Sequence, residues 1–167
     1  NNNNIAGNNN TAVGKSAMDT NTSGYENTVI GKDADVTAGN LFNATALGYN
    51  ALVNANNKVR IGNTSVTVIE GQVGFTAASD IRFKRDIKDI DEGLDLITKL
   101  RPVSYRMKND DNRMNWGFIA QEIESLIGTE NAVLTIGEDK DRTLGLRYSD
   151  FVAPLVKSVQ ELNAKIE

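Results

Sequence analysis

A serine and a lysine five residues apart are the side chains of this sequence best suited to nucleophilic chemistry. Ser79 carries a hydroxyl, and Lys84 carries an amine that can accept the hydroxyl proton when the amine is uncharged. An uncharged lysine requires burial, or neighbouring cations that lower the pKa of the amine from its free value of about 10.4. Arg82 and Arg85 lie close enough in sequence to act as such cations. The pair therefore predicts a serine nucleophile with a lysine base, in a chain that cuts itself.

The five-residue spacing sets a geometric condition on this pair. Residues five apart point to different sides of both a helix and a strand. Contact between Ser79 and Lys84 therefore needs an intervening turn, or a lysine from a neighbouring chain. The ordinary alternative is that Ser79 and Asp80 cap a turn and that Lys84 is a solvated surface side chain.

The pair lies where the composition of the chain changes. Residues 1–78 are rich in Asn and Gly, contain no proline and carry only nine charged side chains. Residues 79–167 contain both prolines, the single tryptophan and most of the charge. We therefore expect two parts, a repetitive part over residues 1–78 and a globular part over residues 79–167.

The charge and the missing residue types exclude several classes of function. The formal net charge is −4, without the basic patch expected of a protein that binds nucleic acid or an anionic membrane. Cysteine and histidine are absent, which excludes disulfides, thiol catalysis and histidine catalysis. We predict no cofactor and no metal, and we find no membrane-spanning run or signal peptide. The first residue is Asn, so we expect a fragment of a longer chain.

Residues 1–78 contain a repeat that aligns on glycines. The segments with sequences NTAVGKSA, NTVIGKDA and ATALGYNA place Gly14, Gly31 and Gly48 at intervals of 17 residues, and Gly62 follows after 14 more. Each repeat supplies one short apolar strand, a glycine where the backbone turns or packs closely, and a small alanine. Such strands must stack on copies of themselves. We expect an intertwined triple-stranded β-helix or β-roll, with one strand per layer from several chains; the alternative is a disordered Asn-rich linker.

The second part has the pattern of a small α+β domain. We expect a helix with Ile90, Leu94 and Ile97 on one face behind an Asp91 cap, ending before Pro102. Strands are expected over 103–108 and 115–118, a helix over 119–127, and a hairpin of 132–136 with 143–148 around a charged loop.

The last segment, residues 150–167, has the spacing of a coiled coil. Its apolar residues recur at intervals of three and four: Val152, Leu155, Val159, Leu162 and Ile166. This row favours oligomerisation, and these residues alone do not separate a dimer from a trimer. The alternative is a helix that packs on its own domain.

Four strings in the second part carry a resemblance to a known family: SDIRFKRDI (79–87), LRPVSY (100–105), WGFIAQE (116–122), and Tyr148 followed by PLVKSVQEL (154–162). Residues 79–167 thereby resemble the endosialidase-type intramolecular chaperone domain at the C-terminus of phage tailspikes and tail fibres. The repeats resemble the heads of trimeric autotransporter adhesins and the triple-stranded β-helical stems of phage fibres.

The resemblance implies a homotrimer in which residues 79–167 fold their own upstream stem and then release themselves. Ser79 matches the nucleophile of the family and Lys84 its base, so the chain is expected to be a single-turnover serine endopeptidase. The cut is expected next to Ser79, either between Ser79 and Asp80 or between Ala78 and Ser79. The implied location is a virion tail fibre or tailspike assembled in the bacterial cytoplasm. The alternatives are a trimerisation module that does not cleave and, less favoured, a membrane-tethered transcription factor released by such a domain.

Overall fold

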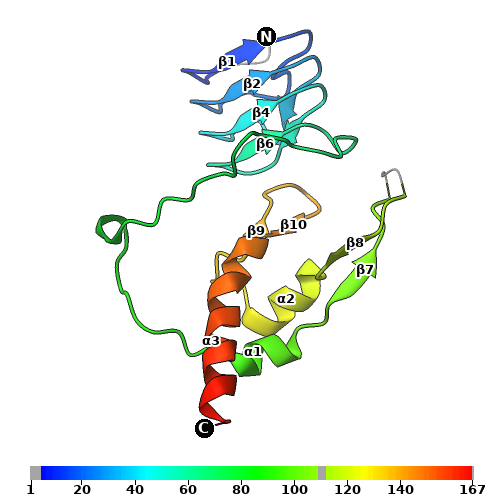
Figure 1. Cartoon of the computed structure of the whole chain (residues 1–167). Coiled ribbons are helices and arrows are strands. Elements are labelled where there is room, and N and C mark those ends of the chain that lie inside the picture. Colours follow the sequence, from blue (N-terminus) through cyan, green and yellow to red (C-terminus); the bar gives the residue numbers. More distant parts are fainter. Residues whose placement is uncertain (1–4, 109–111, 167) are drawn as a thin grey trace. The chain divides into compact units, whose positions relative to one another are not determined.

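The computed structural model describes residues 5–108 and 112–166 (Figure 1). The chain divides into two compact units. The first contains Asn1–Thr67 together with the segments Arg106–Arg113 and Thr135–Gly145. The second contains Val68–Tyr105, Met114–Leu134 and Leu146–Glu167, so residues 78 and 79 both fall inside it.

The first unit is a stack of short parallel strands, which we call the stack. One side is the sheet β1-β2-β4-β6, whose strands lie one above another in Figure 1. A second side pairs β3 with β5. The bounds are β1 (Thr11–Val13), β2 (Thr28–Ile30), β3 (Asp35–Val36), β4 (Thr45–Leu47), β5 (Leu52–Val53) and β6 (Val59–Ile61).

The core of the stack is built from small side chains. The central residue of each inner strand points inward, so Val29 and Ala46 are completely buried. The alanine three residues after each repeat glycine is buried in the same way, as Ala34 and Ala51 show. Because alanine and valine occupy so little volume, the two sides of the stack can approach closely.

The repeat glycines are required by the backbone. Gly14, Gly31 and Gly48 have φ values of +130°, +139° and +112°, which side chains of L-residues rarely adopt. They also lie directly over one another: a Cβ on Gly14 would lie 2.6 Å from the carbonyl oxygen of Gly31. The predicted role of these glycines in turning and close packing is confirmed.

Asparagines join one layer to the next. Asn10 accepts a hydrogen bond from the backbone N–H of Asn27 at 2.9 Å and donates to the carbonyl of Gly24 at 2.7 Å. Asn27 repeats this arrangement one layer on, accepting from Ala44 at 2.9 Å and donating to Leu41 at 2.7 Å. Because Asn27 is completely buried, these bonds satisfy backbone groups that water cannot reach.

The expectation that several chains share each layer needs correction. In the described residues, β2 pairs with β1 and β4 of the same chain, in the register Thr11–Thr28–Thr45. The physical reason is the length of the repeat: 14 to 17 residues suffice for one chain to run round a complete coil and stack on itself. The alternative of a disordered linker is also wrong for the stack.

The second unit is a mixture of helices and small sheets with a C-terminal helix. Its elements, together with the β9–β10 hairpin whose loop belongs to the first unit, are the 3-10 turn η1 (Ile81–Phe83), α1 (Leu94–Lys99), β7 (Val103–Tyr105), β8 (Asn115–Gly117), α2 (Ala120–Ile127), β9 (Leu134–Ile136), β10 (Leu144–Leu146), the 3-10 turn η2 (Tyr148–Phe151) and α3 (Val152–Ala164). Antiparallel pairing of β7 with β8 agrees with the predicted alternation.

A small aromatic and aliphatic core holds this unit together. Ile123 of α2, Val133 and Phe151 are buried against one another. Phe118 packs on Phe151 with ring centroids 5.2 Å apart, and its backbone N–H donates to the hydroxyl oxygen of Tyr148 at 3.1 Å. These contacts tie α2 to the segment that leads into α3.

Helix α1 is shorter than predicted, because its N-terminus is capped from outside. The carboxylate of Glu161 in α3 accepts the backbone N–H of Leu94 at 2.7 Å. A Cβ on Gly93 would lie 2.6 Å from this carboxylate, so the capping carboxylate can approach only where a glycine precedes the helix. The predicted Asp91 cap is therefore replaced by a side chain distant in sequence.

The glycine column of the stack makes a first prediction. Gly31→Ala places a Cβ 2.4 Å from the carbonyl oxygen of Gly48 and at a φ of +139°, so it should destabilise the stack by roughly 2 kcal/mol or more. Thermal unfolding followed by circular dichroism measures the loss. Gly74→Ala, which has open space around its Cβ, is the control and should leave the transition unchanged. Equal transitions for the two variants would contradict the packing argument.

Candidate active site

The segment between Ser79 and Lys84 folds into a tight turn. The backbone N–H of Phe83 donates to the carbonyl of Asp80 at 3.0 Å, and that of Lys84 donates to the carbonyl of Ile81 at 3.1 Å. These two bonds define η1, and the chain is extended on both sides of it. The turn reverses the offset that a helix or strand would impose on residues five apart.

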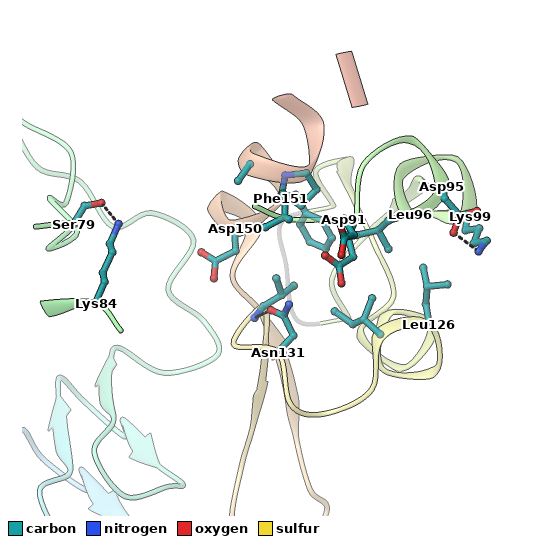
Figure 2. Close-up of a pocket in the computed structure, with 16 residues that line it drawn as sticks. Ser79, Lys84, Asp91, Asp95, Leu96, Lys99, Leu126, Asn131, Asp150 and Phe151 are labelled. Carbon is teal, nitrogen blue, oxygen red and sulfur yellow. Dashed lines mark hydrogen bonds and ion pairs between the residues drawn. The ribbon is translucent and has the colours of Figure 1, made fainter. Parts of the chain in front are cut away.

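As a result, the two predicted residues meet. Nζ of Lys84 donates to Oγ of Ser79 at 2.8 Å, and Figure 2 shows the two side chains pointing toward each other. The structure thus supplies the intervening turn within one chain. Both side chains are exposed. The geometry suits proton transfer from the hydroxyl to the amine, because hydrogen-bond distance is the first requirement for a general base.

Asp80 and Arg82 hold the turn from its outer side. Oδ1 of Asp80 accepts the backbone N–H of Arg82 at 2.9 Å, which makes Asp80 the N-cap of η1. The guanidinium of Arg82 also donates to Oδ2 at 2.7 Å. The side-chain bond from Arg82, then its backbone bond, lowers the pKa of Asp80 below 3.8 against a small opposing effect of burial. Sequence reasoning missed this role of Asp80, although an Asp directly before a turn is a cap signal.

The expected cationic environment of the lysine is corrected by the same contacts. Arg82 is paired with Asp80, and Arg85 lies 3.7 Å from a carboxylate oxygen of Asp86. Each guanidinium therefore faces a neutralising carboxylate, so neither arginine presents an uncompensated positive charge to the amine of Lys84.

A pocket of about 890 Å³ includes the pair in its lining. Its other walls come from the same unit and combine apolar side chains, such as Leu96, Leu126 and Phe151, with the carboxylates of Asp91, Asp95 and Asp150 (Figure 2). No group of three or more acidic side chains capable of holding a metal ion is found among residues 5–108 and 112–166.

Comparison with known proteins bears on this segment. Residues 79–134 match the model of a protein family described as chaperone of endosialidase. The chain carries an endosialidase-type chaperone domain. The match begins at Ser79 itself and runs through η1, α1, the β7–β8 pair and α2 to the start of β9. No curated protein matches the chain.

Helix α3, at the end of the unit that carries the chaperone domain, has its apolar face outward. The residues that face α1 and the core include Ser158, 4% exposed, and Glu161, which caps α1. The predicted row lies on the opposite side, where Val159 is 64% exposed. The other exposed residues of the row are Val152, Leu155, Leu162 and Ile166. The helix therefore packs on its own domain through a largely polar face, and its apolar row remains available.

The loop between β9 and β10 contacts the base of the stack within the first unit. The backbone N–H of Glu138 donates to the carbonyl of Asn54 at 2.6 Å, and its carboxylate accepts from Nδ2 of Asn56 at 3.0 Å. Asp139 accepts from Nδ2 of Asn54 and from the hydroxyl of Thr143. Burial acts to raise the pKa of Asp139, but these bonds outweigh it and lower the pKa. The second loop expected to protrude, 110–113, lies partly outside the described residues.

The helices of the chaperone domain offer no membrane anchor. Across the part of the chain that the structure describes, every helix falls short of the length and hydropathy that a bilayer requires.

The ion pair at η1 makes a second prediction. Because the pKa of Asp80 is depressed by Arg82, its stabilising effect on the turn is complete above the ordinary value near 3.9 and disappears as the pH falls through the lower value. A pH titration of the Asp80 side-chain carboxyl carbon by NMR in the intact chain measures this midpoint. Arg82→Ala should move the midpoint upward; an unmoved midpoint would contradict the pairing.

Proposed function

We propose that residues 79–167 bring three copies of the chain together, guide folding of the stack that precedes them, and then cut the chain next to Ser79. The observation that carries this proposal is the 2.8 Å contact between Lys84 Nζ and Ser79 Oγ at the first residue of the matched family segment. The chain is then a self-cleaving serine endopeptidase that acts once, and it needs neither cofactor nor metal.

The exposed row of α3 supports the assembly step. An apolar row repeating every three and four residues is stable in water only when other helices cover it. Three copies joined at α3 would hold their stacks at a high effective concentration and set their relative register. The same surface would also serve a trimerisation module that does not cleave, which is the competing function.

The contacts of the β9–β10 loop support the chaperone step. Parallel stacks fold slowly because each strand pairs with a residue 14 to 17 positions away, and their open strand edges invite aggregation. The loop offers Glu138 and Asp139 to Asn54 and Asn56 at the last coil of the stack. A chaperone that presents hydrogen-bonding groups at this coil would supply a template on which the next layer forms.

The cleavage step follows from the chemistry of the pair. Lys84 takes the proton of Ser79, and Oγ attacks a backbone carbonyl carbon. The C–N bond breaks, the departing amine receives the proton from the lysine ammonium, and an ester to Oγ remains. Water then hydrolyses the ester, which releases a new carboxylate and restores the serine hydroxyl.

The two possible bonds differ in the ring that the attack must close. Attack by Ser79 on the carbonyl of Ala78 forms a five-membered ring, so one chain can do it alone, and the second fragment then begins with Ser79. Attack on its own carbonyl, at the bond to Asp80, would close a strained four-membered ring. Cleavage of that bond is therefore expected to use the hydroxyl of the equivalent serine in a neighbouring copy.

Solvent exposure of the pair explains why cleavage would wait for assembly. A lysine is a base only when uncharged, and removal from water favours the uncharged amine. Ser79 and Lys84 are in contact but exposed in the single chain. A neighbouring copy that covered them would provide the missing burial, so that assembled trimers alone would cut. Cleavage would leave the stack without its chaperone, and therefore kinetically trapped.

The family of the domain places this activity in a phage tail. We propose that the stack is part of a tail fibre or tailspike, assembled in the cytoplasm of the bacterial host. The domain from residue 79 or 80 onward would be released after cleavage and would be missing from the finished virion.

Substitution of the pair gives the direct test. Ser79→Ala and Lys84→Ala should each yield a folded trimer whose cleavage is slower by about a hundredfold or more, since one removes the nucleophile and the other its base. Denaturing mass spectrometry of freshly made protein measures cleavage and identifies the bond from the fragment masses. Ser65→Ala and Lys88→Ala are the matched controls and should be cut normally. Processing of either dyad variant at this junction would exclude the mechanism, and a single uncut wild-type species would favour the competing function.

Assembly through α3 has its own test. Val159→Asp places a charge in the apolar row, and burying it unpaired would prevent association. We expect sedimentation to show a single chain, and cleavage to be lost with the trimer. Gln160→Asp adds the same charge one residue away, on an exposed position outside the row, and should leave both unchanged. A trimer of the Val159→Asp chain would show that α3 does not hold the copies together.

A further inference from the structure

We propose that Asp80 and Arg82 are positioning residues for self-cleavage, because together they hold the turn that brings Nζ of Lys84 onto Oγ of Ser79. This inference rests on the function proposed above and assigns a role to two residues that need not touch the reacting atoms. We call the pair the clamp.

The need for a clamp follows from the reach of the chain. Five residues in extended conformation would separate the Cα atoms of Ser79 and Lys84 by about 17 Å, far beyond the reach of a lysine side chain. The segment lies outside the hydrophobic core, and Ile81 and Phe83 within η1 are 71% and 77% exposed. Tertiary packing therefore does little to hold the turn, and local hydrogen bonds must do it.

The clamp bonds to the backbone at the point where the turn begins. Oδ1 of Asp80 fixes the N–H of Arg82 at 2.9 Å, and the guanidinium of Arg82 holds the same carboxylate through Nε at 3.1 Å and through the second nitrogen at 2.7 Å. The arginine thus keeps the carboxylate in the rotamer that caps the turn. The cap should matter more than the ion pair, because exposed ion pairs contribute little on their own.

The same segment contains a matched pair that lacks this arrangement. Arg85 and Asp86 are adjacent and oppositely charged, but they are 3.7 Å apart and their side chains are 96% and 91% exposed. Their substitution changes charge near the dyad by the same amount as substitution of the clamp. It leaves the hydrogen bonds of η1 intact, so it separates positioning from a general electrostatic effect.

The experiment measures the first-order rate of cleavage of the full chain made in a cell-free system, with the trimer fraction determined by sedimentation. Asp80→Ala should slow cleavage about tenfold at an unchanged trimer fraction, and Asp80→Asn, which keeps the acceptor, should recover most of the rate. Arg82→Ala should be intermediate. Asp86→Ala and Arg85→Ala should cleave at the wild-type rate.

A double substitution guards against a different explanation, since Asp80 also flanks one of the possible scissile bonds. If the two residues act as one clamp, Asp80→Ala with Arg82→Ala should be no slower than Asp80→Ala alone. Multiplying effects, or equal slowing by Asp86→Ala, would overturn the inference. If Asp80→Ala does not trimerise, Arg82→Ala compared with Arg85→Ala decides, and equal rates overturn it.

Failure of the clamp and failure of the proposed function give different results in this assay. Cleavage of Ser79→Ala would remove the self-cleavage mechanism, and the clamp with it. An inert Ser79→Ala, together with clamp variants that cleave at the wild-type rate, would leave the dyad standing and remove only the positioning role.

Discussion

An apolar row left in water is the constraint on which the second unit depends. Helix α3 meets the rest of its domain through Ser158 and Glu161, and its aliphatic side chains point the other way. A soluble helix normally buries its apolar face and exposes its polar one. The reversed arrangement means that the domain is held together by specific polar contacts, while its main hydrophobic surface is reserved for other molecules. The long-range cap from Glu161 to Leu94 keeps α3 in this orientation.

The stack solves a related problem with different means. Its strands are two or three residues long and its core is mostly alanine and valine, so each layer buries little apolar area. Stability must come from repetition, through in-register strand pairing, close glycine contacts and asparagines that bond to the neighbouring layer. Because every layer leans on the next, the ends are the weak points, and a loop that supplies hydrogen bonds at the last coil addresses one of them.

Local patterns in the sequence predicted much of this architecture. The glycine repeat located the strands, the alternation around Ser104 located β7, and the three-four spacing located α3. The meeting of Ser79 and Lys84 was predicted only conditionally, because the turn that joins them depends on a cap at Asp80 whose side-chain direction a sequence does not reveal. The intrachain pairing of the stack was missed, since a strand pattern specifies which edges bond but not which chain supplies the partner. The cap of α1 was missed because its donor and acceptor are 67 residues apart.

The in-register pairing of the stack also bears on how such proteins change over generations. Each coil contacts only the coils directly before and after it, and the 14- and 17-residue periods differ by what their bends hold rather than by the strands they stack. Gain or loss of one whole period therefore preserves every kind of contact. Unequal recombination between repeats could lengthen or shorten the shaft in discrete steps, with the terminal domain left untouched.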